Sequence, residues 1–267
     1  MRLKGNFEPE AFANDDASLF MIQYLPATDP VAYRVVNLDL THRKVFPVYG
    51  REKSPGETMT GTRLIQTPSP DGTTLYTLYT SQPPAYAREY TPAQAQAGRP
   101  VAFIHTLSLH EGWAHCIGLP KPLWGGDPTH EALAVALSNG PVYVVDTARG
   151  VIASMNTNDL TIERTTRVSF GAPSHAQAKA AVSSDGLTLF VANGSQLVAI
   201  DTTSLRPRLR WTAAGPVRGL GTGADGLHLY AAMQDEVAVM DPSTGRETGM
   251  IPAPATNEIR YVGTLAA

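Results

Sequence analysis

A repeated pattern of about 40 residues constrains the fold of this 267-residue chain more than any other feature. The segments Ala180–Leu205 and Leu220–Gly245 each read as a short strand, an Asp-Gly turn, a β-rich strand, a second turn and an apolar strand ending in Asp. Their Asp-Gly pairs, Asp185-Gly186 and Asp225-Gly226, coincide in this alignment. A four-stranded unit of that period is the size of one blade of a β-propeller.

The same pattern fits three earlier segments, Glu10–Tyr49, Thr67–Leu119 and Glu131–Phe170. Their strands are short, rich in Val, Ile, Leu, Tyr and Thr, and bounded by Gly, Pro, Asn or Asp. No long segment has the 3.6-residue period of a helix. We therefore predict an all-β propeller of four-stranded antiparallel blades, forming a single domain over residues 1–267. Five blades are recognisable, at residues 8–50, 61–120, 130–170, 178–212 and 216–254, with terminal strands at 2–7 and 259–265.

The composition excludes several classes of protein. Hydrophobic residues make up 43% of the chain and charged residues 17%, which argues against disorder and against long surface helices. A net charge of -3 gives no electrostatic footprint for nucleic acid. No stretch reaches the roughly 18 apolar residues of a membrane span, and the single cysteine, Cys116, excludes an intrachain disulfide. The N-terminus lacks a secretory signal, so the compartment is unspecified; a truncated N-terminus would indicate an exported or cell-surface protein.

Several motifs carry a resemblance to a known group of proteins. The turn SPDG at Ser69–Gly72, the strands that follow such turns, and the endings D-T-x-x-L and D-P-x-T-G resemble those of YVTN/WD40-like bacterial β-propellers. The segments IQYLPATDP, PVYGREK and HEGWAHCIGLP are similar to uncharacterised actinobacterial propeller proteins of that group. The resemblance implies the fold and no particular activity, because such folds host lactonases, dehydrogenases and binding platforms alike.

Ring closure is the open question for such a fold. No residues remain for the two inner strands of a sixth blade, and propellers of the group generally carry more blades. Three outcomes stay open: a strained five-bladed ring, an open fragment completed by another polypeptide, or a partial blade built from both termini. We favour an incomplete ring, such as part of a seven-bladed propeller. The sequence therefore predicts a protein partner or self-association through the blade edges of blades 1 and 5.

The long loops indicate where a ligand would bind. In an antiparallel blade with strands A to D, the B–C and D–A connections lie at the same end. The long connections 26–32, 50–61, 81–100, 120–130 and 171–177 all belong to that end. They carry Tyr, Trp and Arg, which are enriched at binding hot spots. The predicted ligand-binding residues are Tyr49, Arg51, Tyr86, Arg88, Tyr90, Arg99, Trp124, Asp127 and His130; the alternative is that they cap blade edges or fold the loops.

A histidine-rich hairpin invites a metal interpretation, which we set aside. The spacing H-E-x3-H at His110 differs from the H-E-x2-H of zinc proteases, which lies on a helix. Pairing Leu109 with Trp113 would place His105 and His115 on one face of the sheet, without a third ligand. Incidental histidines are favoured, so we predict neither a metal nor another cofactor, and we assign no catalytic residue.

The function predicted from sequence is therefore binding rather than catalysis. The leading hypothesis is a scaffold that presents its long-loop face to a protein or glycan partner. The alternative is a lactonase-like propeller hydrolase with a metal at the mouth of the channel, which would need several convergent carboxylate, Asn or His side chains.

Overall fold

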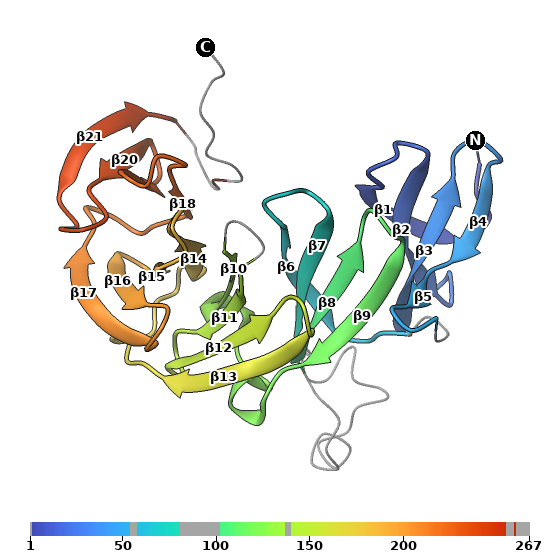
Figure 1. Cartoon of the computed structure of the whole chain (residues 1–267), viewed down its shortest axis with the longest axis horizontal. Coiled ribbons are helices and arrows are strands. Elements are labelled where there is room, and N and C mark those ends of the chain that lie inside the picture. Colours follow the sequence, from blue (N-terminus) through green and yellow to red (C-terminus); the bar gives the residue numbers. More distant parts are fainter. Residues whose placement is uncertain (1, 54–57, 81–101, 137–139, 255–258, 260–267) are drawn as a thin grey trace. The chain divides into compact units, whose positions relative to one another are not determined.

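A computed structural model describes residues 2–53, 58–80, 102–136, 140–254 and 259. Within these residues the chain is all-β, with strands in five sheets and two short 3-10 helices, η1 (Lys121–Leu123) and η2 (Pro128–His130) (Figure 1). The chain divides into two compact units, an N-terminal unit of residues 1–125 and a C-terminal unit of residues 126–267. No helix among the described residues has the length and apolar character that crossing a membrane requires.

The N-terminal unit holds two sheets. Sheet 1 has the order β1-β2-β3-β4, and sheet 2 has the order β5-β9-β8-β7-β6. The strands of sheet 1 are β1 (Asn6–Phe12), β2 (Ser18–Leu25), β3 (Ala32–Asp39) and β4 (Lys44–Pro47). Those of sheet 2 are β5 (Tyr49–Gly50), β6 (Thr62–Pro68), β7 (Thr74–Thr80), β8 (Ala102–Ser108) and β9 (Trp113–Gly118).

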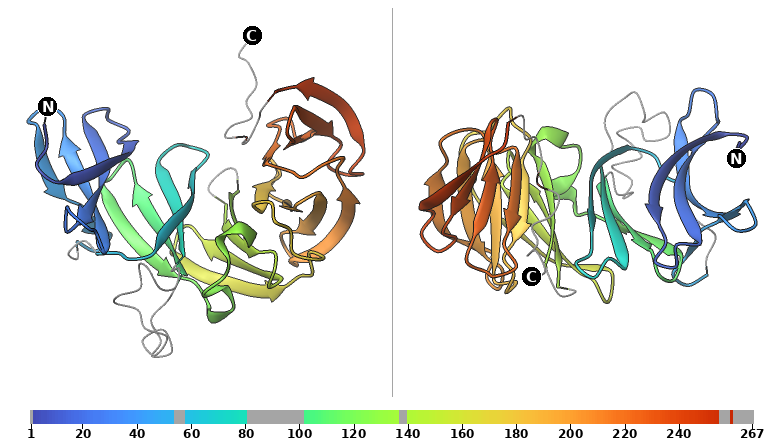
Figure 2. Two further views of the ribbon diagram at one scale, coloured as in Figure 1. Left: turned by 180° about the vertical axis from the view of Figure 1, so that it is seen from behind. Right: turned by 90° about the horizontal axis from the view of Figure 1, so that it is seen from above.

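The C-terminal unit holds three sheets, each with its four strands in sequence order. Sheet 3 comprises β10 (Glu131–Val135), β11 (Val142–Asp146), β12 (Val151–Asn156) and β13 (Thr161–Arg167). Sheet 4 comprises β14 (Lys179–Val182), β15 (Thr188–Asn193), β16 (Gln196–Asp201) and β17 (Arg206–Thr212). Sheet 5 comprises β18 (Gly219–Thr222), β19 (Leu229–Ala232), β20 (Glu236–Met240) and β21 (Glu247–Pro252). The strands of each sheet stay side by side in the two further views (Figure 2).

The predicted all-β class and the five four-stranded meanders are confirmed, and these blade-like sheets are consistent with a propeller. Whether all of them form a single domain stays a prediction. One detail is wrong: residues 2–7 do not form a separate terminal strand, because Asn6 and Phe7 begin β1 and pair with Tyr24 and Gln23. Most of the other expected terminal strand, 259–265, lies outside the described residues. The sequence also gave no sign of β5, which pairs in parallel with β9.

The core lies between neighbouring sheets of the same unit. Sheets 1 and 2 pack through a cluster that includes Phe20, Tyr33 and Tyr79. Sheets 3 and 4 share a second cluster, and sheets 4 and 5 a third that includes Phe190 and Leu229. The inner strands are apolar on both faces, as in the fully buried VYVVD of β11, whereas the fourth strands β13, β17 and β21 are largely exposed. This gradient explains why the inner strands have little of the polar alternation of a one-sided sheet.

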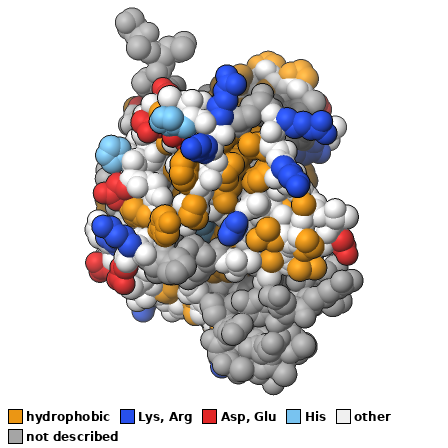
Figure 3. All heavy atoms as spheres, turned by 90° about the vertical axis from the view of Figure 1, so that its right-hand side faces the viewer, with side chains coloured by type: hydrophobic (Ala, Val, Ile, Leu, Met, Phe, Trp, Pro, Cys, Tyr) orange, Lys and Arg blue, Asp and Glu red, His pale blue; other side chains and the backbone are white. Residues whose placement is uncertain are grey.

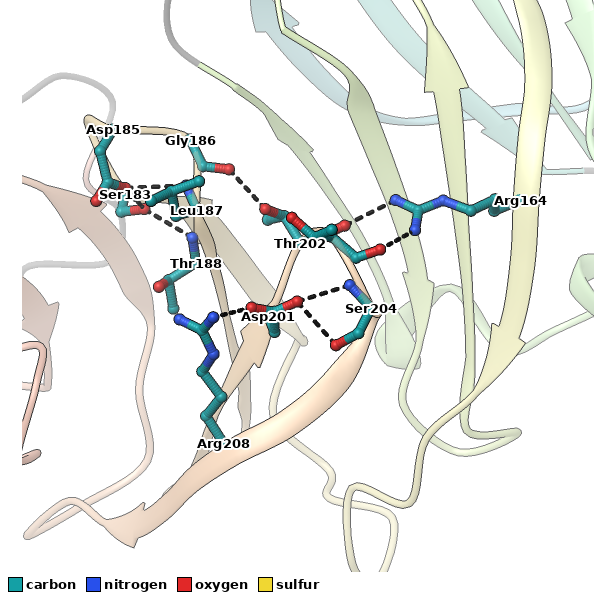
Figure 4. Close-up of polar contacts among 11 residues, drawn as sticks. Arg164, Ser183, Asp185, Gly186, Leu187, Thr188, Asp201, Thr202, Ser204 and Arg208 are labelled. Atoms are coloured by element: carbon teal, nitrogen blue, oxygen red, sulfur yellow. Dashed lines mark hydrogen bonds and ion pairs between the residues drawn. The ribbon is translucent and has the colours of Figure 1, made fainter.

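The repeated Asp residues build the turns (Figure 4). At the first turn of sheet 4, Oδ1 of Asp185 accepts hydrogen bonds from the Ser183 hydroxyl at 2.6 Å and the Leu187 amide at 2.9 Å. Gly186 follows with a φ of 73°, a backbone conformation that favours glycine. At the next turn but one, Asp201 accepts from the amide and hydroxyl of Ser204. The Asp-Gly repeat is thus turn chemistry.

Candidate functional site

The predicted loop residues of the N-terminal unit that the structure describes lie on or near the edge of sheet 2. Tyr49 is 54% exposed and pairs in parallel with Trp113, and the Arg51 guanidinium lies 5.6 Å from the centre of the Trp113 ring. The Trp124 indole donates to the Leu119 carbonyl at 2.6 Å. The structure thus brings Tyr49 and Arg51 together around a tryptophan that the sequence analysis did not select. Tyr86, Arg88, Tyr90 and Arg99 lie outside the described residues.

In the C-terminal unit, Asp127 is the N-cap of η2 and His130 is its last residue. Oδ1 of Asp127 accepts the Thr129 amide at 2.9 Å, and the hydrogen bonds from Thr129 lower the pKa of this carboxyl. The His130 carbonyl accepts a hydrogen bond from the Thr147 amide at 2.8 Å. Nδ1 of the His130 ring is buried without a hydrogen-bond partner. Both residues therefore help to fold their own loop. Ligand binding by the predicted loop residues stays a prediction.

A cavity of about 290 Å³ lies between sheets 1 and 2, at one end of their strands. It collects residues from the end of β2, the start of β3, the start of β6 and the end of β7. At this end, the second strand of each sheet connects to the third, and the first strand begins. We call it the B–C end. Sequence topology assigned the long loops to the same end. The described lining residues are Ile22, Tyr24, Pro30, Val31, Ala32, Tyr33, Gly61, Thr62, Arg63 and Tyr79.

A polar network joins the two sheets beside this cavity. Arg63 forms an ion pair with Glu8, whose Oε2 accepts the Tyr24 hydroxyl at 2.5 Å. The bond from Tyr24 is the main cause of the lowered pKa of Glu8. Glu10 lies two residues after Glu8 on β1. Gln66 donates a hydrogen bond to Oε1 of Glu10 at 3.2 Å, but Oε2 of Glu10 is buried without a partner. Burial raises the pKa of Glu10 to about 7, so this carboxyl is partly protonated near neutral pH.

Stacked aromatic rings form the deep wall of the cavity. The rings of Tyr33 and Tyr79 lie 5.4 Å apart at 25°, and those of Tyr79 and Phe103 lie 5.0 Å apart at 14°. The Tyr24 ring meets that of Tyr33 edge-on at 6.3 Å. Tyr79 is 1% exposed and its hydroxyl has no hydrogen-bond partner. A buried hydroxyl without a partner is uncommon in folded proteins and calls for an explanation.

The histidine hairpin behind this wall differs from its predicted register. His105 pairs with Cys116, and His115 pairs with Thr106. His105 and His115 therefore lie on opposite faces of sheet 2 rather than on one face. Burial lowers the pKa of His105 to about 4, so it is neutral at physiological pH. Among the described residues, no three His, Cys, Asp or Glu side chains converge as they would around a metal ion.

A buried carboxylate pair in the C-terminal unit went undetected in the sequence. Glu131 begins β10 directly opposite Asp146, the last residue of β11, and the two are 2% and 0% exposed. Oδ1 of Asp146 accepts the Arg149 amide at 2.8 Å. Its Oδ2 and both oxygens of Glu131 have no hydrogen-bond partner. A Cβ atom on Gly126 would lie 2.6 Å from the Glu131 Oε1 and 2.8 Å from the Asp146 Oδ2, so a larger residue there would force the two carboxyl groups to shift.

The environment of this pair favours protonation of Glu131. Burial, followed by the charge of Asp146, raises the pKa of Glu131 to about 8. The Arg149 Nε lies 3.6 Å from Oδ2 of Asp146 and balances one negative charge. A protonated Glu131 therefore reduces the negative charge buried at this pair. The pair sits inside the unit and not on its surface, which indicates a structural role.

Comparison with known proteins bears on the fold. No protein-family model and no curated protein matches the chain. Among solved structures, hydrazine synthase of Kuenenia stuttgartiensis is 18% identical, with a TM-score of 0.52 over 74% of this chain and 51% of that chain. A functionally unknown protein from Desulfotomaculum acetoxidans is 14% identical, with a TM-score of 0.54 over 96% of this chain and 75% of that one. The likeness is one of fold.

These neighbours point to a propeller-type β structure and carry no activity over to this chain. The chain spans about half the length of the hydrazine synthase chain that it matches. The finer resemblance to the YVTN/WD40-like group rests on motifs in the sequence.

Proposed function

We propose that this chain is a non-enzymatic binding module, a propeller-type scaffold of the YVTN/WD40-like kind that presents the B–C end of its sheets to a protein or glycan partner. The observation that carries the proposal is the cavity at that end of sheets 1 and 2. Its floor, formed by Ile22, Ala32, Tyr33 and Tyr79, is buried, while its rim is half-buried. A concave, mainly apolar site with a few polar groups is the usual form of a ligand site.

The chemistry beside the cavity supports binding over catalysis. Glu8 and Arg63 are engaged with each other, and Tyr24 holds Glu8 in place. A hydrolase would need a nucleophile, or a metal-bound water, next to a base. The metal-dependent hydrolase remains the alternative, and elemental analysis of the purified protein separates the two. Stoichiometric bound metal would favour the hydrolase.

A plug at the rim of the cavity tests the proposal. Thr62 is half-buried and lines the cavity, so we expect Thr62→Trp to fill it and to weaken binding at least tenfold. The matched control is Thr41→Trp, an exposed position at the opposite end of sheet 1. Binding is measured on glycan and protein arrays with wild type and both variants, after circular dichroism has shown that each is folded. Equal loss in both variants, or no loss in Thr62→Trp, would contradict the proposal.

A further inference from the structure

We infer that the cavity between sheets 1 and 2 takes a neutral, hydroxyl-bearing ring of the size of one sugar unit. This inference rests on the proposed function and names the chemical class of its ligand. Three properties of the cavity carry it: its aromatic wall, its charge balance, and an unused hydroxyl at its deep end.

The volume of the cavity and its aromatic wall favour a single ring. A volume of about 290 Å³ lies just below the usual range for small-molecule sites, about 300–1,000 Å³, and suits one ring better than a chain of them. Tyr24, Tyr33 and Tyr79 contribute to its lining. Tyrosine offers a flat, rigid and largely apolar surface with a polar tip. The C–H faces of a sugar ring pack well on such surfaces, while its hydroxyl groups need polar partners.

Charge balance selects against ions. Of the described lining residues, Arg63 alone carries a formal charge, and its ion pair with Glu8 offsets that charge. Glu10 lies behind the pair, and desolvation keeps it partly protonated near neutral pH. An anion would have to compete with Glu8 for Arg63, and a cation placed over the tyrosine rings would meet the guanidinium. A neutral ligand meets neither obstacle.

The deep hydroxyl supplies the specificity. The Tyr79 O–H is buried and has no acceptor, although its ring is held between those of Tyr33 and Phe103. Burial, followed by the charge of Glu10, raises the pKa of Tyr79, so its hydroxyl keeps its proton and stays a donor. A ligand hydroxyl can accept a hydrogen bond, so it suits a site with a spare donor. A ligand without an acceptor would leave this donor unused.

Ligand-detected NMR with defined probes tests this inference. The probes are the methyl glycosides of glucose, galactose, mannose and N-acetylglucosamine, together with tetramethylammonium and inorganic phosphate as charged counterparts. We expect saturation transfer to at least one glycoside and to neither ion. Tyr79→Phe removes only the unpartnered hydroxyl and should weaken glycoside binding about tenfold, the usual effect of one lost hydrogen bond. Tyr76→Phe, at a buried tyrosine of the same strand that does not line the cavity, is the matched control.

The possible outcomes separate the two proposals. Binding of an ion and of no glycoside, or equal glycoside binding by wild type and Tyr79→Phe, would overturn the ligand class. If no glycoside binds but Thr62→Trp still abolishes capture of an array partner, the binding module stands and the sugar-sized ligand is wrong. If glycosides fail and Thr62→Trp has no effect, both proposals are wrong.

Discussion

Replacing Glu131 with glutamine is expected to make the protein more stable at alkaline pH than the wild type, by on the order of 1–3 kcal/mol. In the folded state the pKa of Glu131 is raised from its ordinary value of 4.5 to about 8. The folded state therefore binds the proton more tightly than the unfolded state does. This contribution to stability is fully present below about pH 4.5 and is lost as the pH rises through about 8. Glutamine resembles the protonated form and cannot ionise.

The measurement is urea denaturation between about pH 5 and about pH 8.5 for both proteins. The charged groups that face Glu131 are Asp146, Arg149 and Asp127, and all three remain in the variant, so the difference between the two curves isolates the Glu131 proton. Other groups, such as Glu10, cancel in that difference. Glu247→Gln, at an exposed position of β21, is the control and should run parallel to the wild type. Parallel curves for Glu131→Gln and the wild type would show that the folded state does not raise the pKa of Glu131.

The outer face of sheet 1 offers a surface for self-association of the chain. The face of sheet 1 that points away from sheet 2 is apolar, because Phe7, Met21, Val36, Val45 and Pro47 alternate onto it along the four strands. A groove of about 390 Å³ runs over this face, with Lys4 and Arg34 in its lining. Figure 3 shows hydrophobic side chains gathered there between lysine and arginine side chains. Sheet faces of this kind are covered in a closed propeller.

We expect the chain to self-associate through this face, as the blade count predicts. Like charges disfavour two copies of the basic groove facing each other, so the free face of sheet 5, with Tyr230, Val239 and the 49% exposed Ile251, is the expected counterpart. Light scattering should give a mean mass that rises above 28.5 kDa with concentration.

Two double variants test which face is used. Val45→Glu with Phe46→Glu, at positions 37% and 47% exposed, should return the mass to that of a monomer. Leu187→Glu with Leu227→Glu adds the same charge at exposed turn positions and should leave association unchanged. A wild-type protein that stays monomeric at every concentration, or equal effects of the two double variants, would contradict this prediction.

The fold was predictable because its signals are local. The Asp-Gly pairs at Gly186 and Gly226 fix positive-φ turns, and the short apolar runs between turns, rich in β-branched residues, are typical of buried strands. The register of β8 against β9 could not be predicted, because it depends on how the turn between them closes. The Gly112 amide bonds to the Ser108 carbonyl, which shifts the pairing by one residue. A shift of one residue moves every side chain to the opposite face, and with it the relation of His105 to His115.

The sites were less predictable because they depend on packing between sheets. Asp146 ends a strand as Asp201 does, so in the sequence it reads as one more turn residue, and only its pairing with Glu131 distinguishes it. The cavity likewise forms from Tyr33 and Tyr79, which belong to different repeats. Loop length and topology predicted ligand binding at the end of the sheets where the cavity lies, but none of the predicted residues that the structure describes lines it.

The central claim, that ligands bind at the B–C end, is tested most directly by hydrogen exchange. The measurement compares backbone amides of the free protein with those of its complex with an array-selected partner. We predict slower exchange in the complex for residues 22–33 and 61–63, which surround the cavity. The turns at the opposite end of the sheets, such as Asp71-Gly72 and Thr41–Arg43, should be unchanged. Protection of those turns, with none around the cavity, would contradict the account.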